Sequence, residues 1–257
     1  DTVGNEASTT QTNNTVNLID KAPPTVSSVT ATTANGSYNA GDAIAVTVVF
    51  SEAVAVTGTP QLTLETGNSD AVVNYTSGTG TTTLTFTYTI ASGHNSADLD
   101  YASTGALALN GGSIKDAAGN NANLALVQPG AANSLAANKA LIVDTVTPTV
   151  TSVSSSTDNG SYRTGDVIAI TITFSENVFV NSDLFQNDGT GRPRLTLETG
   201  STDQGVNYTS GSGGTTLTWS YTVASGNTSS DLDYHSTSAL ALNSGTIKDA
   251  AGNNAVL

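Results

Sequence analysis

The sequence predicts an all-β fold of two tandem sandwich domains, from an internal repeat, alternating apolar residues and regularly spaced turns. The segment at 25–56 recurs at 149–180, so the 257 residues divide into two similar halves. Chains of this length hold about two domains of ordinary size, and a long internal repeat indicates that both adopt one fold. We therefore expect two homologous domains.

Further motifs recur in the same order along both halves. They are LTLETG at 62–67 and 195–200, DLDY at 98–101 and 231–234, and IKDAAGNNA at 114–122 and 247–255. The second copy carries an insertion, NSDLFQNDGTGRPRL at 181–195, between the first repeated segment and these motifs. We expect one domain at 20–143 and the other at 144–257, preceded by a short segment at 1–19.

Apolar residues alternate with small or hydroxylated residues in the repeated segments, which is typical of strands with one buried face. In each half, a run of four apolar residues is spaced by two: Ile44, Val46, Val48 and Phe50, then Ile168, Ile170, Ile172 and Phe174. Ala45 and Thr47 fall on the opposite face, which we expect to meet solvent. The pattern predicts strands throughout.

In the first half the alternating runs predict seven strands and require no helix. They lie near 25–32, 43–50, 61–66, 71–76, 82–90, 106–114 and 139–143. Turn signals such as Asn35-Gly36 and Ser77-Gly78 separate them. Seven short antiparallel strands per half predict two tandem immunoglobulin-like β-sandwiches.

The repeated motifs resemble those of a known protein family. The strings GDAIAVTVVFSE, LTLETG, DLDY and IKDAAGN, closed by VDTVTPTV, are similar to the bacterial Ig-like repeats of giant secreted adhesins and other repetitive surface proteins. The resemblance covers essentially the whole chain, twice. It implies an extracellular, non-enzymatic spacer that calcium stiffens.

The charge balance narrows the choice of partners. Charged residues make up 11% of the chain, with 21 Asp and Glu against 7 Lys and Arg, for a net charge of −14. Such a surface repels phosphate backbones and anionic lipid but attracts metal cations. Nucleic acid is therefore excluded as a partner, and no apolar stretch is long enough to predict membrane insertion.

The two histidines of the chain do not belong to the repeated motifs. His94 aligns with Asn227, and His235 aligns with Ala102, so neither histidine recurs in the other copy. The chain has no cysteine, which excludes disulfides and thiolate chemistry. These patterns predict that the protein is not an enzyme, and that both histidines lie on exposed loops.

Acidic residues gather at the expected junction of the two domains if the strands alternate strictly in direction. Five carboxylates then converge there: Asp98, Asp100, Asp144, Glu176 and Asp249. So many like charges repel unless neutralised, and calcium takes carboxylate and carbonyl oxygens as ligands. The alternative is that Asp100 or Asp249 only caps a turn. The repeat adds further candidate calcium ligands: Asp20, Glu52, Asp116, Asp231 and Asp233.

Three functional classes fit these features. The first is a structural module of a surface stalk or filament, whose partners are adjacent repeats or copies of itself. The second is an adhesin domain that binds carbohydrate or another surface, and the third is an accessory module of a larger secreted enzyme. All three are extracellular or located at the cell surface, which fits the acidic, Thr- and Gly-rich composition.

The two copies differ in how they close. Copy one continues through a segment at 125–143, whereas Leu257 corresponds to Leu124, so copy two lacks the last strand. Residues 1–19 have the length of this missing segment, and Val16, Leu18 and Ile19 match its apolar end. We expect this N-terminal strand to complete the second domain of a neighbouring chain, by strand addition, or of the preceding repeat in a covalent array.

Overall fold

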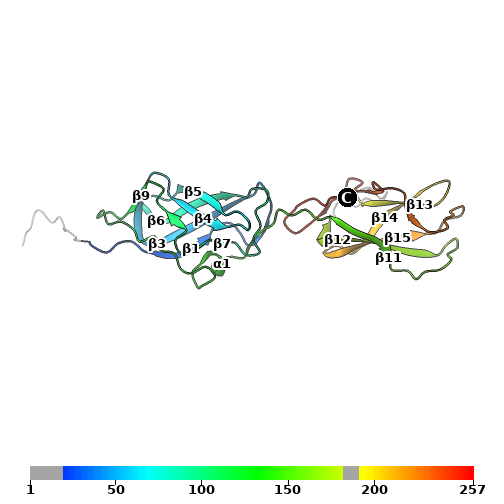
Figure 1. Cartoon of the computed structure of the whole chain (residues 1–257), viewed down its shortest axis with the longest axis horizontal. Helices are drawn as coiled ribbons and strands as arrows, with labels where there is room; N and C mark the ends of the chain where they lie inside the picture. Colours follow the sequence, from blue (N-terminus) through cyan, green and yellow to red (C-terminus); the bar gives the residue numbers. More distant parts are fainter. Residues whose placement is uncertain (1–19, 182–190) are drawn as a thin grey trace, which may run out of the picture.

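The computed structural model describes residues 20–181 and 191–257 and shows two β domains that lie end to end (Figure 1). Each has its own hydrophobic core, one built from residues between 29 and 143 and the other from residues between 168 and 247. The all-β prediction is confirmed. The prediction for residues 1–19 lies outside the described residues, as does most of the insertion.

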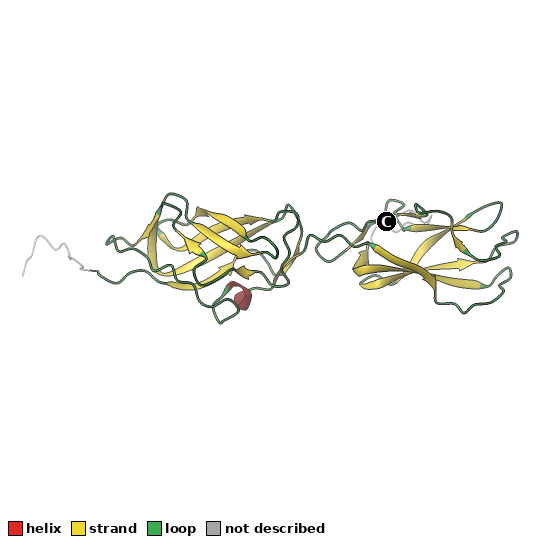
Figure 2. Ribbon diagram, viewed as in Figure 1, coloured by secondary structure: helices red, strands yellow, loops and turns green. Residues whose placement is uncertain are grey.

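Domain 1 contains ten strands and one short helix among the described residues. In chain order they are β1 (Val26–Ala31), β2 (Gly36–Tyr38), β3 (Ala43–Thr57), β4 (Gln61–Glu65), β5 (Ala71–Ser77), β6 (Thr81–Thr89), β7 (Asp100–Tyr101), β8 (Leu107–Ala108), β9 (Ser113–Lys115), α1 (Leu135–Asn138) and β10 (Leu141–Val143). Figure 2 shows that strands and loops account for nearly all of the fold.

The main sheet of domain 1 curls over to form both layers of a sandwich. Its strand order is β1-β3-β6-β5-β4-β7, with β8 beside β4 and β9 beside the end of β3. Strand β5 pairs with β4 through Ala71–Asn74 and with β6 from Tyr75 onward. Strand β3 likewise pairs with β6 first and with β9 at its end. Both strands therefore connect the two layers.

Domain 2 repeats this topology. Its strands are β11 (Val150–Ser155), β12 (Val167–Val180), β13 (Arg194–Glu198), β14 (Gln204–Ser210), β15 (Gly214–Thr222), β16 (Asp233–Tyr234), β17 (Leu240–Ala241) and β18 (Ile247–Lys248). The order β11-β12-β15-β14-β13-β16 matches that of domain 1 strand for strand. Equivalent motifs therefore occupy equivalent places in the two domains.

The alternating pattern places the core as expected. In domain 1, Ile44, Val46 and Val48 are fully buried. In domain 2, Trp219 is fully buried. Thr47, expected to face solvent, is only 4% exposed. It lies on a central strand, with Thr30 of β1 on one side and Thr85 of β6 on the other.

Domain 1 has short elements that the alternation did not predict. The strand expected at 106–114 is divided into β8 and β9, because Asn110 and Gly111 both have positive φ and turn the chain. The helix α1 was not expected either. It starts after Ser134, whose Oγ accepts a hydrogen bond from Ala137 N at 3.2 Å, as a helix N-cap does.

Residues 125–143, here called the closing segment, complete domain 1. Strand β10 pairs in parallel with β2, and Leu135, Leu141 and Val143 are at most 1% exposed. No counterpart of this segment lies among the described residues of domain 2. A cavity of about 740 Å³ lies there instead, lined by residues of β11, β12, β15 and β16. Tyr234 is 39% exposed, whereas its equivalent Tyr101 is 1% exposed.

Candidate metal centres at the domain poles

Three carboxylates meet where the linker enters domain 2. Asp144 directly follows β10, Glu176 lies in β12, and Asp249 directly follows β18. One carboxylate oxygen from each residue lies within 4.8 Å of the others. We call this set the junction group. The strands and the linker thus bring three acidic residues distant in sequence to one pole.

A turn at residues 249–253 fixes the position of Asp249. The Oδ1 of Asp249 accepts a hydrogen bond from Asn253 N at 2.9 Å, and its Oδ2 accepts one from Asn253 Nδ2 at 2.8 Å. The same Nδ2 donates to the carbonyl oxygen of Asp144 at 2.9 Å. Asn253 therefore joins the turn of domain 2 to the linker.

Domain 1 carries an equivalent group at its outer pole. Asp20, Glu52 and Asp116 also place one carboxylate oxygen each within 4.8 Å of the others. Asn120 is the equivalent of Asn253. Its Nδ2 donates to Asp116 Oδ2 at 2.6 Å and to the Asp20 carbonyl at 3.2 Å. We call this set the outer group. The same arrangement of three carboxylates therefore occurs in both copies of the repeat.

Electrostatics differ among the members of each group. Burial raises the pKa of Glu176, and repulsion from Asp144 and Asp249 raises it further. The pKa of Glu52 is raised in the same way, by burial and then by its two acidic neighbours. A cation bound among the three oxygens of either group would relieve this repulsion.

Hydrogen bonds have the opposite effect on Asp116. Burial raises its pKa, but hydrogen bonds from the side chain and backbone of Asn120 and from the backbone of Gly119 and Ala118 outweigh burial, and the pKa is lowered. Its charged form is therefore stabilised by the turn that it closes. Asp249, for which turn capping is the alternative to metal binding, accepts the equivalent hydrogen bonds from Asn253 and also belongs to the junction group.

Asp98 and Asp100 do not join the junction group, so the prediction of five converging carboxylates holds for only three. Asp98 is exposed. Asp100 is 8% exposed, and its two oxygens accept hydrogen bonds from Tyr101 N and Gly130 N, each at 2.9 Å. The carboxylate of Asp100 therefore anchors the closing segment.

The equivalent residues of domain 2 also lie apart from the carboxylate groups. Asp231 is exposed, and the Oδ1 of Asp233 accepts a hydrogen bond from Tyr234 N at 2.8 Å. Strand direction suggested the ends of the domains at which these aspartates would lie. It did not reveal that the backbone of the next residue would occupy the carboxylate of Asp100 and of Asp233.

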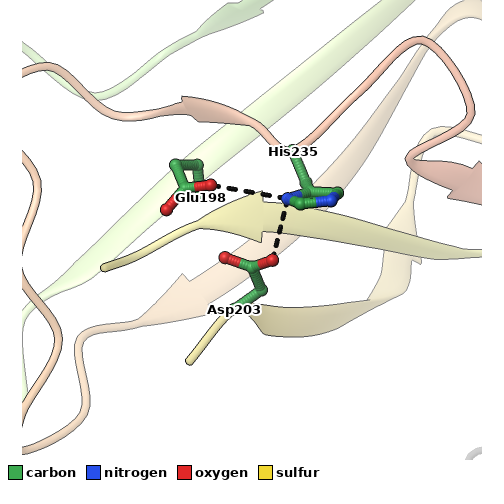
Figure 3. A group of neighbouring side chains, drawn as sticks. All are labelled: Glu198, Asp203 and His235. Atoms are coloured by element: carbon green, nitrogen blue, oxygen red, sulfur yellow. Dashed lines mark hydrogen bonds and ion pairs between the residues drawn. The ribbon is translucent and has the colours of Figure 1, made fainter. Parts of the chain in front are cut away.

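A third group combines acidic residues with a histidine. Glu198, Asp203 and His235 meet on the surface of domain 2, with one ligand atom each within 4.8 Å of the others (Figure 3). The sequence comparison set His235 aside because copy one has Ala102 there. The sequence shows that the histidine directly follows the DLDY motif, and the structure adds that this motif lies beside LTLETG in the sheet.

Residues 20–128 match the family model of the bacterial Ig-like domain. This match confirms the resemblance inferred from the repeated motifs, which recur in domain 2. A bacterial Ig-like domain fits a module of a bacterial surface protein. The curated proteins include none that matches the chain. Within the described ranges, no helix has the length and apolar character needed to cross a membrane.

Proposed function

We propose that this chain is a non-catalytic structural module of a repetitive extracellular bacterial protein, in which calcium stiffens the junctions between domains. The support comes from the tandem repeat, the acidic surface and the bacterial Ig-like match. The observation that carries the proposal is the junction group, because one of its three carboxylates belongs to the linker and two belong to domain 2.

The linker is held to both domains at adjacent residues. Toward domain 1, Thr145 N donates to Asn95 Oδ1 at 2.9 Å, and Gly93 N donates to Thr145 Oγ1 at 3.0 Å. Toward domain 2, Asp144 contributes its carbonyl to Asn253 and its carboxylate to the junction group. An ion in this group would fix Asp144 relative to domain 2, and thereby reduce rotation between the domains.

The chemistry of the ligands favours calcium over softer metals. All three side chains of the junction group offer carboxylate oxygens, and the Asp144 carbonyl shares the Asn253 amide with the Asp249 carboxylate. Calcium takes six to eight oxygen ligands, with water filling the remaining positions, and tolerates irregular geometry. The outer group offers the same ligands to an ion at the next junction of a longer array.

Small-angle scattering of the full chain, with calcium and with chelator, tests this proposal. Calcium should lengthen the maximum dimension and narrow the range of domain orientations. Glu176→Gln should abolish the change in shape, whereas Glu52→Gln should preserve it, because Glu52 lies in the outer group away from the junction. An unchanged scattering curve with calcium, or an equal response of the two variants, would contradict the proposal.

Head-to-tail assembly is a second part of the proposed function. The cavity in domain 2 lies between β11 and β16, the places that correspond to the neighbours of the closing segment in domain 1. In domain 1, Asn138 Nδ2 donates to the Val29 carbonyl at 2.8 Å, and Leu99 N donates to the Leu141 carbonyl at 2.8 Å. We propose that a strand equivalent to the closing segment fills the cavity of domain 2.

The full chain and one deletion form distinguish the sources of this strand. Residues 1–257 and residues 20–257 are purified separately and imaged at high concentration. Strand exchange between chains predicts filaments from the first form and none from the second. A monomeric first form would contradict exchange and support a continuous covalent array. In that case, a synthetic peptide of residues 125–143 should still bind and raise the melting temperature of domain 2.

A further inference from the structure

The surface group of Glu198, Asp203 and His235 is separate from both polar carboxylate groups. Glu198 ends β13, Asp203 precedes β14, and His235 follows β16. His235 Nδ1 lies 2.8 Å from Asp203 Oδ2 and 3.4 Å from Glu198 Oε2. Figure 3 shows both carboxylates directed at this one ring nitrogen. Three separate segments of domain 2 thus present ligand atoms to one point.

Backbone hydrogen bonds hold the Glu198 side chain and fix the main chain at His235. Gly200 N donates to Glu198 Oε1 at 3.3 Å, which leaves Oε2 toward the histidine. His235 N donates to the Thr196 carbonyl at 3.0 Å, and this bond continues the pairing of β16 with β13. A contact such as that of Gly200 with Glu198 orients a ligand before a metal binds. Side-chain exposures of 50% for Glu198 and His235 and 27% for Asp203 leave the site open to solvent.

One ring nitrogen carries at most one proton, so a single N–H must serve two carboxylates in this arrangement. A divalent cation among the three ligand atoms would interact with all of them at once. An imidazole nitrogen suits zinc and related transition metals, whereas calcium takes oxygen ligands. We propose that Glu198, Asp203 and His235 form a zinc-class site that crosslinks β13, β14 and β16, with water completing the coordination.

Domain 1 provides a natural comparison for this site. Glu65 and Asp70 occupy the equivalent acidic positions, and Gly67 N donates to Glu65 Oε1 at 3.2 Å as in domain 2. Ala102 replaces the histidine, although its backbone N donates to the Thr63 carbonyl at 3.0 Å in the same way. The repeat thus supplies the two carboxylates, and His235 adds the ligand that changes the metal preference.

Isothermal titration of the full chain with zinc chloride, in excess calcium to occupy sites made only of oxygen, tests the proposal. Wild type should bind one equivalent. His235→Ala, which restores the residue of copy one, should lose it, whereas His94→Ala should keep it. Ala102→His should add a second equivalent in domain 1, because the two carboxylates are already there.

Each outcome decides for or against the site. Zinc binding that survives His235→Ala would overturn the assignment, and so would a wild-type chain that binds no zinc and uses the three residues only as an ion pair. A failure of Ala102→His to gain zinc would contradict the claim that the repeated carboxylates need only a histidine. Circular dichroism of each variant confirms the fold, and the site does not depend on the proposed calcium junction.

Discussion

Truncation of one side chain in the closing segment should destabilise domain 1 alone. Leu141 is fully buried in β10, and Leu141→Ala removes most of its side chain while keeping the backbone bond from Leu99 N to the Leu141 carbonyl. Domain 2 contains no equivalent of β10 among its described residues. The variant therefore separates the contribution of the closing segment from the stability of the rest of the chain.

The expected cost follows from the burial of the side chain. Leucine-to-alanine changes at fully buried sites cost about 2–5 kcal/mol, and sites that can relax fall at the lower end. Strand β10 is only three residues long and is bonded to β2, Leu99 and Ser96, so its surroundings can partly adjust and we expect about 3 kcal/mol. For a domain of this size, that lowers the melting temperature by roughly 12 °C.

The single tryptophan makes the assay specific to each domain. Trp219 is the one tryptophan of the chain and is fully buried in the core of domain 2. Urea unfolding followed by its fluorescence reports on domain 2, whereas far-ultraviolet circular dichroism reports on both domains. Leu141→Ala should shift part of the circular dichroism transition and leave the fluorescence transition unchanged, with chelator present throughout.

A matched variant in domain 2 completes the test. Leu217 is fully buried in β15, so Leu217→Ala should shift the fluorescence transition and leave the remaining dichroism transition in place. If Leu141→Ala moved the fluorescence transition as far as the dichroism transition, the two domains would unfold as one unit. The assignment of the closing segment to domain 1 alone would then be refuted.

Three further predictions concern the turns and the junction. Because the folded pKa of Glu176 is raised above its ordinary value of 4.5, its contribution to stability is complete below that pH and is lost as pH rises. In chelator, Glu176→Gln should therefore melt close to wild type near pH 4 and above it at pH 7. Gly80→Ala should cost roughly 1–2 kcal/mol in urea unfolding, for its positive φ alone. Gly78→Ala should cost at least twice as much, because its Cβ would lie 2.0 Å from the Thr83 carbonyl. Asn253→Ala should cost about 2 kcal/mol by Trp219 fluorescence, because two hydrogen bonds of its amide are lost.

Features set by local pattern could be predicted from the sequence. The repeat and the two-residue alternation indicated the all-β fold, and strand direction placed Glu176 and Asp249 at the pole where Asp144 lies. These predictions needed only the period of the strands and the order of the motifs. The turn formed by Asp249 and Asn253 follows from the same motif in both domains.

Features that depend on contacts between distant segments could not be predicted in this way. Asp100 was expected at the junction, but Gly130 of the closing segment donates to its carboxylate instead. Nothing in the local sequence of Asp100 signals that contact. His235 was set aside because it does not recur, although its ligand partners do. Comparison of repeats finds shared sites, and a site gained by one copy is missed unless its neighbours in the sheet are also known.

The parallel pairing of β10 with β2 determines how domain 1 carries mechanical load. The chain enters the domain at β1, beside the outer group, and leaves it at β10, beside the junction group. Tension along a stalk would therefore pull β1 and β10 toward opposite poles. The hydrogen bonds that hold β10 to β2 and to the loop at Ser96 run across β10 itself, so a pull along this strand would shear them together rather than open them one at a time.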